Sequence, residues 1–363
     1  MIPYSRQAID DDDIAAVVDV LKGDWLTTGP HIEQFERAVA DAVEAEHAVA
    51  FANGTAALHG AGAAAGLGPG DLLVTSALTF VASANCGRFA GADVALADIS
   101  PDTLNLDPAT LPTAADRPID ALVPVHFAGL PFDLSTLAAR PARVVIEDAA
   151  HALGARTPDG PIGNCARSDM CIFSFHPVKH VTTGEGGMVT TNSAELADAL
   201  RRFRSHGTVP KREHGGWYYE VESIGFNYRL TDMQAALGTS QMAKLERFVQ
   251  RRNELAERYR ERLAGLPLTL PPAAPDGFRH AYHLFAIRVA DRRRVYDELR
   301  ARSVGTQVHY VPVYRHPLYA HLGPPERYPE TEAAYEGLLS LPLFPTLTED
   351  EQDEVVAALE EIL

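Results

Sequence analysis

Residues 171–187 read CIFSFHPVKHVTTGEGG, an apolar run that ends at a proline and leads through one lysine into a glycine-rich turn. The apolar part, stopped by Pro177, is typical of a buried strand. Lysine is seldom placed between a buried strand and a tight turn unless it is paired or used chemically. Burial there would lower the pKa of Lys179 and make its amino group a nucleophile able to form Schiff bases. The alternative is a surface lysine at a strand end, and this stretch alone does not decide between the two.

Composition narrows the class of protein. The 363 residues are 46% hydrophobic and 22% charged, which is ordinary for a soluble globular protein with a large core. A net charge of −17 argues against a nucleic-acid or anionic-membrane partner. The arginine groups at 201–204, 251–262 and 292–302 are expected to form solvated helix faces.

Cysteine usage and apolar runs bear on metals and on location. There are three cysteines, with neither a CxxC pair nor an HExxH motif, so the sequence predicts no metal site and indicates a reducing, cytoplasmic compartment. The N-terminal residues do not read as a signal peptide, and there is no apolar run of about 18 residues, so no membrane span is predicted.

Short apolar segments alternate with helical ones between residues 47 and 204. Such alternation predicts an α/β sheet, largely parallel and covered by helices on both faces. In these sheets chemistry gathers at the carboxyl ends of the strands. Thr55, Asp148, Ser174 and Lys179 each lie at or just after a predicted strand end. The expected strands are 47–52, 71–75, 93–97, 121–125, 144–146, 170–175 and 187–191, and the expected helices 54–65, 81–89 and 193–204.

The flanking segments complete the expected organisation. Helices are predicted at 9–22 and 32–43, and residues 208–229 form a long irregular loop of the kind that serves function or covers a partner. Residues 231–263 read as a long helix, and 266–277, with four prolines, as a linker. Segments 281–289, 292–302, 306–310 and 349–363 then predict a small α+β domain. We therefore expect a large domain over 1–240, with residues 1–30 contributing to the active site, and a small C-terminal domain with its linking helix over 241–363.

Two side chains at and just after the end of the run 144–148, which contains the predicted strand 144–146, suggest a ring-binding site. Asp148 is either a helix cap or loop acid, or a carboxylate that pairs with a protonated heteroaromatic nitrogen. His151 is either a structural histidine or a contact of the same ring.

Three further positions could complete such a site. Gly54-Thr55-Ala56 opens a helix whose free N–H groups suit a phosphate, although strand–glycine–helix junctions are common. Ser174 could add a hydroxyl to that phosphate or bond to the backbone, and Phe80 could stack on a flat ring or belong to the core. Together these groups match the requirements of pyridoxal phosphate (PLP), and no GxGxxG, Walker or GxSxG motif favours another chemistry.

Several stretches together resemble one enzyme family. They are WLTTGP (25–30), NGTAALH (53–59), EDAAH (147–151), FSFHPVK (173–179), GFNYRLTDMQ (225–234) and LPLFP (341–345). In order and spacing the chain is similar to the DegT/StrS nucleotide-sugar aminotransferases. Through residues 174–187 and 306–314 it looks most like the 4-aminotransferases of the pseudaminic acid pathway.

The resemblance implies a fold and a set of cofactor residues. The fold is the fold-type I (aspartate aminotransferase-like) PLP-dependent transferase, with a mostly parallel seven-stranded sheet and a small C-terminal domain, assembled as a homodimer with shared active sites. Lys179 would be the catalytic residue that carries PLP, Asp148 the partner of the pyridine nitrogen, His151 a contact of a cofactor oxygen and Phe80 the stacking ring. The phosphate would be held by Thr55, Ala56 and Ser174 of one subunit and by Asn227 of the partner subunit.

The resemblance also implies a reaction. L-Glutamate would donate the amino group and leave as 2-oxoglutarate, and a 4-keto-6-deoxy nucleotide sugar, UDP-linked and N-acetylated, would receive it. Thr28, Arg229, His309 and Tyr314 are the candidate sugar-nucleotide contacts. Two alternatives stay open: another keto sugar (dTDP- or GDP-linked, or keto at C3), and a non-catalytic PLP-binding sensor of the same fold.

Overall fold

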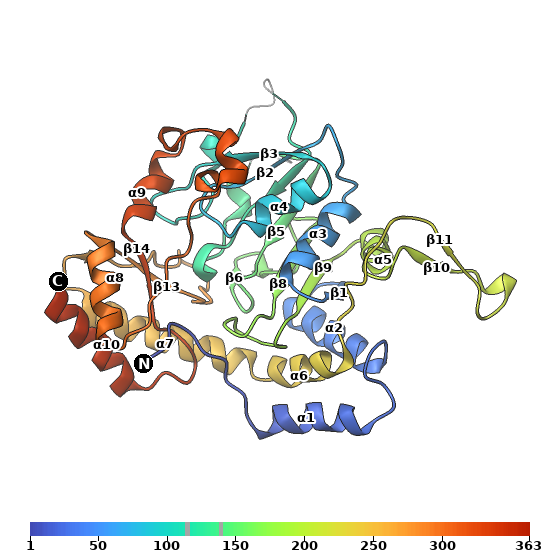
Figure 1. The fold of residues 1–363 in the computed structure, drawn as a ribbon, viewed down its shortest axis with the longest axis horizontal. Coiled ribbons are helices and arrows are strands. Elements are labelled where there is room, and N and C mark those ends of the chain that lie inside the picture. The colour runs from blue at the N-terminus through green and yellow to red at the C-terminus, as the bar shows by residue number, and fades with distance from the viewer. Residues whose placement is uncertain (113–116, 138–140) are drawn as a thin grey trace.

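A seven-stranded sheet forms the centre of the protein (Figure 1). The computed structural model describes residues 1–112, 117–137 and 141–363. Six strands run parallel and only β9 runs antiparallel to its two neighbours, which confirms the predicted, mostly parallel sheet. In spatial order the strands are β1 (His47–Phe51), β9 (Gly187–Thr191), β8 (Met170–Ser174), β5 (Val144–Asp148), β4 (Ala121–Val123), β2 (Leu72–Ser76) and β3 (Asp93–Ala97).

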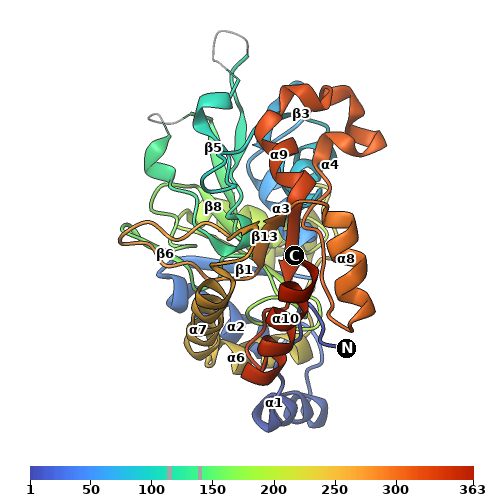
Figure 2. The same cartoon turned by 90° about the vertical axis from the view of Figure 1, so that its left-hand side faces the viewer.

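Helices cover both faces of this sheet (Figure 2). One face packs against α3 (Gly54–Ala64), α4 (Ala82–Phe89) and α5 (Ala194–Phe203). The other packs against α2 (Pro30–Val43), α6 (Asp232–Met242) and the start of α7 (Leu245–Leu263). Ile172 of β8 joins the first core, whereas Cys171 and Phe173 join the second, because successive side chains of a strand point to opposite faces.

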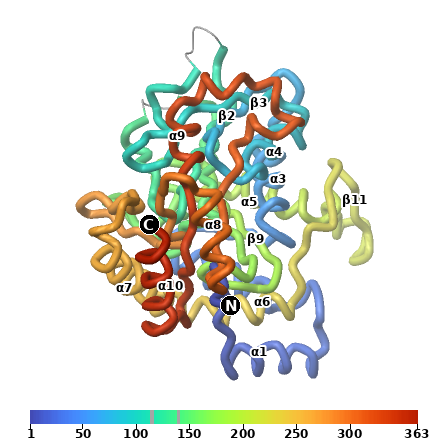
Figure 3. The backbone as a smooth tube through the Cα atoms, turned by 60° about the vertical axis from the view of Figure 1, so that its left-hand side comes forward, coloured from blue at the N-terminus to red at the C-terminus, as the bar shows by residue number. Residues whose placement is uncertain are grey.

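A second, antiparallel sheet forms the small α+β unit near the C-terminus. Its strands are β12 (Leu268–Thr269), β13 (Phe285–Val289) and β14 (Leu338–Leu341). It packs against the second half of α7, α8 (Arg292–Ala301) and α10 (Glu349–Ile362). Ile2 forms a bridge with Val304, so the N-terminus lies against this unit, as the tube in Figure 3 also shows.

The remaining elements are peripheral. The described part of the chain contains two short hairpins, β6–β7 (Arg156–Thr157 and Gly160–Pro161) and β10–β11 (Thr208–Pro210 and Tyr219–Val221). The second lies inside the segment predicted as an irregular loop, and it projects from the body of the molecule (Figure 1). Among the described residues the remaining α-helices are α1 (Asp11–Lys22) and α9 (Pro329–Gly337), and short 3₁₀ helices lie in several connections. Within the described ranges, no helix combines the length and apolar character needed to cross a membrane.

Side-chain caps explain several helix starts. Ser193 accepts a hydrogen bond from the backbone N–H of Leu196 and caps α5. Asn53 caps α3 in the same way, and Thr231 with Gln234 forms a capping box at the start of α6.

Three predictions were wrong in detail. The long helix over 231–263 is divided between α6 and α7 by a turn at Ala243 and Lys244, and Lys244 pairs there with Asp13 of α1 at 2.9 Å. Residues 306–310 do not form a strand, since only Gln307 pairs with Ser340 before the chain turns toward the central cavity. Arg252, expected on a solvated helix face, is fully buried.

Candidate active site

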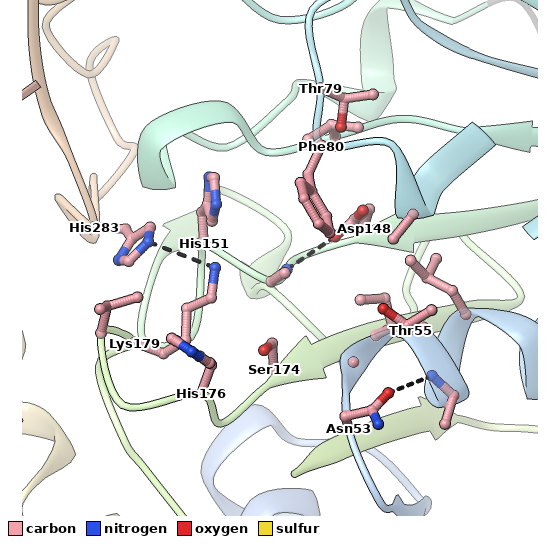
Figure 4. A pocket seen from close by; sticks show the side chains of 18 of the residues that line it. Asn53, Thr55, Thr79, Phe80, Asp148, His151, Ser174, His176, Lys179 and His283 are labelled. Carbon is pink, nitrogen blue, oxygen red and sulfur yellow. Dashed lines mark hydrogen bonds between the residues drawn. The ribbon is translucent and has the colours of Figure 1, made fainter. Parts of the chain in front are cut away.

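A cavity of about 620 Å³ lies at the carboxyl ends of β1, β2, β5 and β8. Because these strands run in the same direction, the segments that follow them meet at one edge of the sheet. Figure 4 shows side chains from all four segments around this space. The polar and aromatic residues that line it include Tyr4, Asn53, Thr55, Thr79, Phe80, Asp148, His151, Ser174, His176, Lys179, Glu185, Tyr228, His283, His309 and Tyr310.

Lys179 projects into the cavity from the turn that follows β8 (Figure 4). Its backbone N–H donates to the His176 carbonyl at 2.9 Å, and its Nζ lies 3.5 Å from Nε2 of His283. Burial lowers the pKa of Lys179 from its ordinary value of 10.5 to about 8; Asp148 opposes this change and Arg252 adds to it. At pH 7 roughly one amino group in ten is therefore neutral and nucleophilic. The surface-lysine alternative does not describe this residue.

The glycine-rich turn after Lys179 returns the chain to β9 beside the start of α3. A Cβ atom at Gly187 would lie 2.3 Å from the Asn53 carbonyl oxygen, so only glycine allows this approach. Gly54 is similarly close to Ser174, whose Cβ would be 3.0 Å from an added Cβ. The lysine turn and the phosphate-type helix start are therefore packed directly together.

Asp148 ends β5 with its carboxylate buried at the cavity. Oδ2 accepts from the Ser83 hydroxyl at 2.6 Å and Oδ1 from the Ala150 N–H at 3.1 Å. Since the single Ser83 proton goes to the carboxylate, the Thr79 hydroxyl, 2.9 Å away, must donate to Ser83. This chain of hydrogen bonds fixes the carboxylate orientation, and no helix of the described ranges is capped by Asp148.

The start of α3 presents a positive helix end to the cavity. Thr55 is exposed there, and the Ser174 hydroxyl faces it from the end of β8 (Figure 4). Ala56 also lines the cavity, but its N–H already donates to Oδ1 of Asn53 at 2.8 Å. The two hydroxyl groups and the helix dipole form a site suited to an anion such as a phosphate.

Neutral aromatic groups form the wall opposite α3. Nε2 of His151 lies 2.9 Å from the Tyr310 hydroxyl, and the Tyr310 ring lies 5.6 Å from that of Phe80. Burial, with a contribution from Lys179, holds the pKa of His151 well below its ordinary value and lowers that of His309 to about 3. Both imidazoles are therefore neutral at physiological pH, and Phe80, 53% exposed, offers an open ring face.

The structure brings eight of the twelve predicted site residues to this cavity. They are Thr55, Ala56, Phe80, Asp148, His151, Ser174, Lys179 and His309.

The other four, Thr28, Asn227, Arg229 and Tyr314, do not line the cavity of their own chain. Tyr314 is buried elsewhere: its hydroxyl donates to Glu332 at 2.5 Å and its ring stacks on Tyr328, because residues 313–315 turn away as a 3₁₀ helix. The Thr28 hydroxyl donates to the neighbouring Thr27 carbonyl, and Asn227 is exposed.

The residues of the site that were not identified from the sequence include Tyr4, Ser83, His283 and Tyr310. Tyr310 lies within residues 306–314, which the resemblance already marked. Tyr4, Ser83 and His283 carried no local signal, because they reach the site only through contacts between segments distant in sequence.

The chemistry of these groups fits PLP. A buried amine of lowered pKa, a fixed carboxylate, an open aromatic face and an anion site at a helix start are what this cofactor requires. The fold and the cavity thus define a fold-type I PLP-dependent enzyme.

Comparison with known proteins gives the family. The chain belongs to the DegT/DnrJ/EryC1/StrS aminotransferase family, whose profile matches residues 7–360. It is 38% identical to the spore coat polysaccharide biosynthesis protein SpsC of Bacillus subtilis over 382 aligned positions, which cover all of this chain and 97% of SpsC.

Solved structures agree over nearly the whole chain. The PLP form of the putative sugar aminotransferase Spr1654 from Streptococcus pneumoniae superposes with a TM-score of 0.91 at 28% identity, covering 100% of this chain and 99% of Spr1654. Helicobacter pylori PseC, an aminotransferase involved in the biosynthesis of pseudoaminic acid, gives 0.90 at 28% identity, covering 99% and 98%. The protein is therefore a PLP-dependent sugar aminotransferase, and the predicted family, enzyme class and cofactor are confirmed.

Proposed function

We propose that this enzyme transfers the amino group of L-glutamate to C4 of a 4-keto-6-deoxy sugar carried on UDP, with an N-acetylated sugar as acceptor. The observation that carries the amino-transfer part of the proposal is the buried Lys179 amine, with its lowered pKa, in the same cavity as the fixed Asp148 carboxylate.

The proposed roles follow from the geometry of the cavity. Lys179 binds PLP covalently and, once freed, takes up and returns the proton that moves during amino transfer. Asp148, held by Ser83, would present its charge to the pyridine nitrogen, and Phe80 would stack on the ring. When bound, PLP supplies an electron sink for the carbanion formed by loss of that proton.

The phosphate and ring-oxygen contacts complete the cofactor site. Thr55 and Ser174, which line the cavity at the start of α3, would hold the phosphate together with the helix dipole, and His151 would contact the ring oxygen. The walls exclude most water from the Lys179 amine, which keeps it nucleophilic.

The remaining phosphate contact, Asn227, would come from the partner subunit of a homodimer with shared active sites. Asn227 is exposed and lies outside the cavity of its own chain, as expected if it completes the cavity of a second subunit. The nearby β10–β11 hairpin and the segment after it expose large apolar side chains, which a partner would cover. They are Trp217 (79% exposed), Tyr219 (58%), Val221 (64%) and Ile224 (85%).

The acceptor proposal rests on relatives. PseC is named for pseudoaminic acid biosynthesis, and its structure covers this chain almost completely. SpsC, named for spore coat polysaccharide biosynthesis, is 38% identical over the whole chain, which favours including other keto sugars as a second candidate. The three cysteines are all unpaired and buried, which supports a reducing compartment such as the cytoplasm.

A panel of acceptors tests the proposal. Purified enzyme with PLP and L-glutamate would be offered 4-keto and 3-keto sugars on UDP, dTDP and GDP, and both 2-oxoglutarate and the amino sugar would be measured. We expect the UDP-linked 4-keto-6-deoxy N-acetyl sugar to react fastest and Lys179→Ala to be inactive. A faster 3-keto, dTDP or GDP substrate would refute the proposed acceptor, and retained turnover in Lys179→Ala would refute the role of the lysine.

A further inference from the structure

Arg252 of α7 is a fully buried cation that has no carboxylate partner among the described residues. Its Nη1 donates to three backbone carbonyls, of Tyr282 (3.2 Å), His283 (3.3 Å) and Leu343 (3.0 Å). Nε and Nη2 have no hydrogen-bond partner. An uncompensated buried charge destabilises a fold, so its presence calls for a function.

The segment that Arg252 binds, residues 281–284, is also held from the large sheet. The Ala281 N–H donates to the Gly129 carbonyl at 2.9 Å and the Leu284 N–H to the Ala128 carbonyl at 3.2 Å. The Ala281 carbonyl accepts from Nε2 of His180 at 2.9 Å. Gly129 permits this approach: an added Cβ would lie 3.0 Å from the backbone nitrogens of both Tyr282 and His283. Residues 281–284 are therefore fixed from two sides.

His283 is the side chain that this fixed segment sends into the cavity (Figure 4). Its Nε2 faces Nζ of Lys179 at 3.5 Å, and its ring lies 4.4 Å from that of His151. Burial and the charge of Lys179 keep the pKa of His283 well below its ordinary value, so the ring is neutral. Facing an ammonium group, Nε2 can only accept, which assigns the ring proton to Nδ1, an atom that is buried without a hydrogen-bond partner.

We propose that His283 is a positioning residue that holds the free Lys179 amino group in the cavity, and that Arg252 fixes His283 by binding the backbone of its segment. The inference rests on the proposed function, in which Lys179 is freed during each half-reaction. The side chain of a free lysine has four rotatable bonds, and a fixed hydrogen-bond acceptor for its ammonium group restricts the positions that the amine can occupy.

Removing His283 and removing Arg252 should shift the pKa of Lys179 in opposite directions. An acceptor stabilises the ammonium, so removing His283 lowers the lysine pKa; Arg252 repels the ammonium, so removing its charge raises that pKa. The titratable and charged groups that surround the amine are Asp148, His151, His180, Arg252, His283 and His309.

The test uses the protein freed of PLP. Lys179 would be acetylated with acetic anhydride over a pH series, and the labelled peptide quantified by mass spectrometry. We expect half-titration near pH 8 for the natural protein. His283→Phe should titrate about one unit lower, since it keeps ring volume but loses the acceptor. His283→Gln, which restores an acceptor, should return toward the natural value, and Arg252→Met should shift upward.

His280 provides the matched control. It is equally buried three residues away, but its ring stacks on Tyr282 at 3.8 Å and does not line the cavity. His280→Phe should leave the Lys179 titration unchanged. An unshifted titration in folded His283→Phe, or an equal shift in His280→Phe, would overturn the proposal.

A second measurement needs no substitution. In the ¹⁵N-labelled natural protein without PLP, the His283 ring should show the Nδ1–H tautomer at pH 6.5 and should respond as Lys179 titrates. An Nε2–H tautomer at that pH would overturn the proposal even if the variants did not fold. Amino transfer from L-glutamate, measured separately with PLP, reports on the proposed function: its absence alongside the expected Lys179 titrations would reject the function and leave the positioning role in place.

Discussion

Replacing Lys179 with methionine should stabilise the PLP-free protein at neutral pH. The Lys179 amino group is enclosed by the cavity walls and close to the cation Arg252, so its ammonium form is disfavoured in the folded state. The unfolded chain holds this group at its ordinary pKa of 10.5, and the folded chain at about 8. A lysine whose folded-state pKa is lowered destabilises the fold below both values, and this penalty disappears as pH rises through 10.5.

The magnitude follows from the two pKa values. At about 1.36 kcal/mol for each pH unit, the interval from 10.5 to about 8 corresponds to about 3 kcal/mol. The residue is partly exposed to the cavity, so solvent screening makes this an upper value. We expect Lys179→Met to be more stable than the natural protein at pH 7, and the difference to shrink by up to about 3 kcal/mol between pH 7 and pH 10.5.

Urea denaturation of both PLP-free proteins across this pH range measures the effect. Lys244→Met is the matched control with the opposite sign. Burial alone would lower the pKa of Lys244, but its hydrogen bonds to Asp10 and Asp13 raise it. Its removal leaves the Asp13 carboxylate buried without a cation and should destabilise the protein by about 3 kcal/mol at pH 7. A stability difference for Lys179→Met that did not change between pH 7 and 10.5 would refute the argument.

Three further outcomes are expected. Ser83→Ala removes the 2.6 Å hydrogen bond to Asp148 and should slow amino transfer by about tenfold to a hundredfold in a glutamate half-reaction assay, with unchanged rates arguing against a role for carboxylate orientation. Gly187→Ala places a Cβ against the Asn53 carbonyl and should lower the free energy of unfolding by about 3 kcal/mol or more. Gly184→Ala, at positive φ but in open space, should lower it by only about 1 kcal/mol. Urea denaturation measures both free energies. If the region around the β10–β11 hairpin forms a subunit contact, Ile224→Asp should increase the monomer fraction measured by light scattering. Leu318→Asp, also exposed but on another element, should leave the monomer fraction unchanged. Equal monomer fractions in the two variants would place the contact elsewhere.

The sequence predicts the sheet well because its signals are local. Apolar runs such as 144–148 and 170–174, bounded by polar or turn residues, mark buried parallel strands directly, and strand ends then locate Asp148, Ser174 and Lys179. Caps such as Ser193 likewise need only neighbouring residues.

The missed features depend on contacts between distant segments. Ser83 reaches Asp148 across 65 positions, and His283 reaches Lys179 across 104. Arg252 lies in a helix rich in exposed charges, so periodicity predicts solvation, and only the packing of residues 281–284 and Leu343 around it explains its burial. Tyr314 does not line the cavity of its own chain for a related reason: it contacts Glu332 and Tyr328, and it lies with Tyr328 in the core.

The state of the Lys179 amine depends on how the two sheets pack against each other. Asp148, at the end of β5, raises the lysine pKa, and taken alone it would keep the amine charged and unreactive. Burial and the charge of Arg252 together lower the lysine pKa by more than Asp148 raises it. Both effects depend on residues 281–284, which lead into the small sheet and cover the edge of the large one. Movement of that segment away from Gly129 would admit water to Lys179 and Arg252 together, and the lysine pKa would return toward 10.5. A nucleophilic amine therefore requires the small unit to be seated on the large one, so a substitution that loosens this contact should reduce lysine reactivity without touching the cavity.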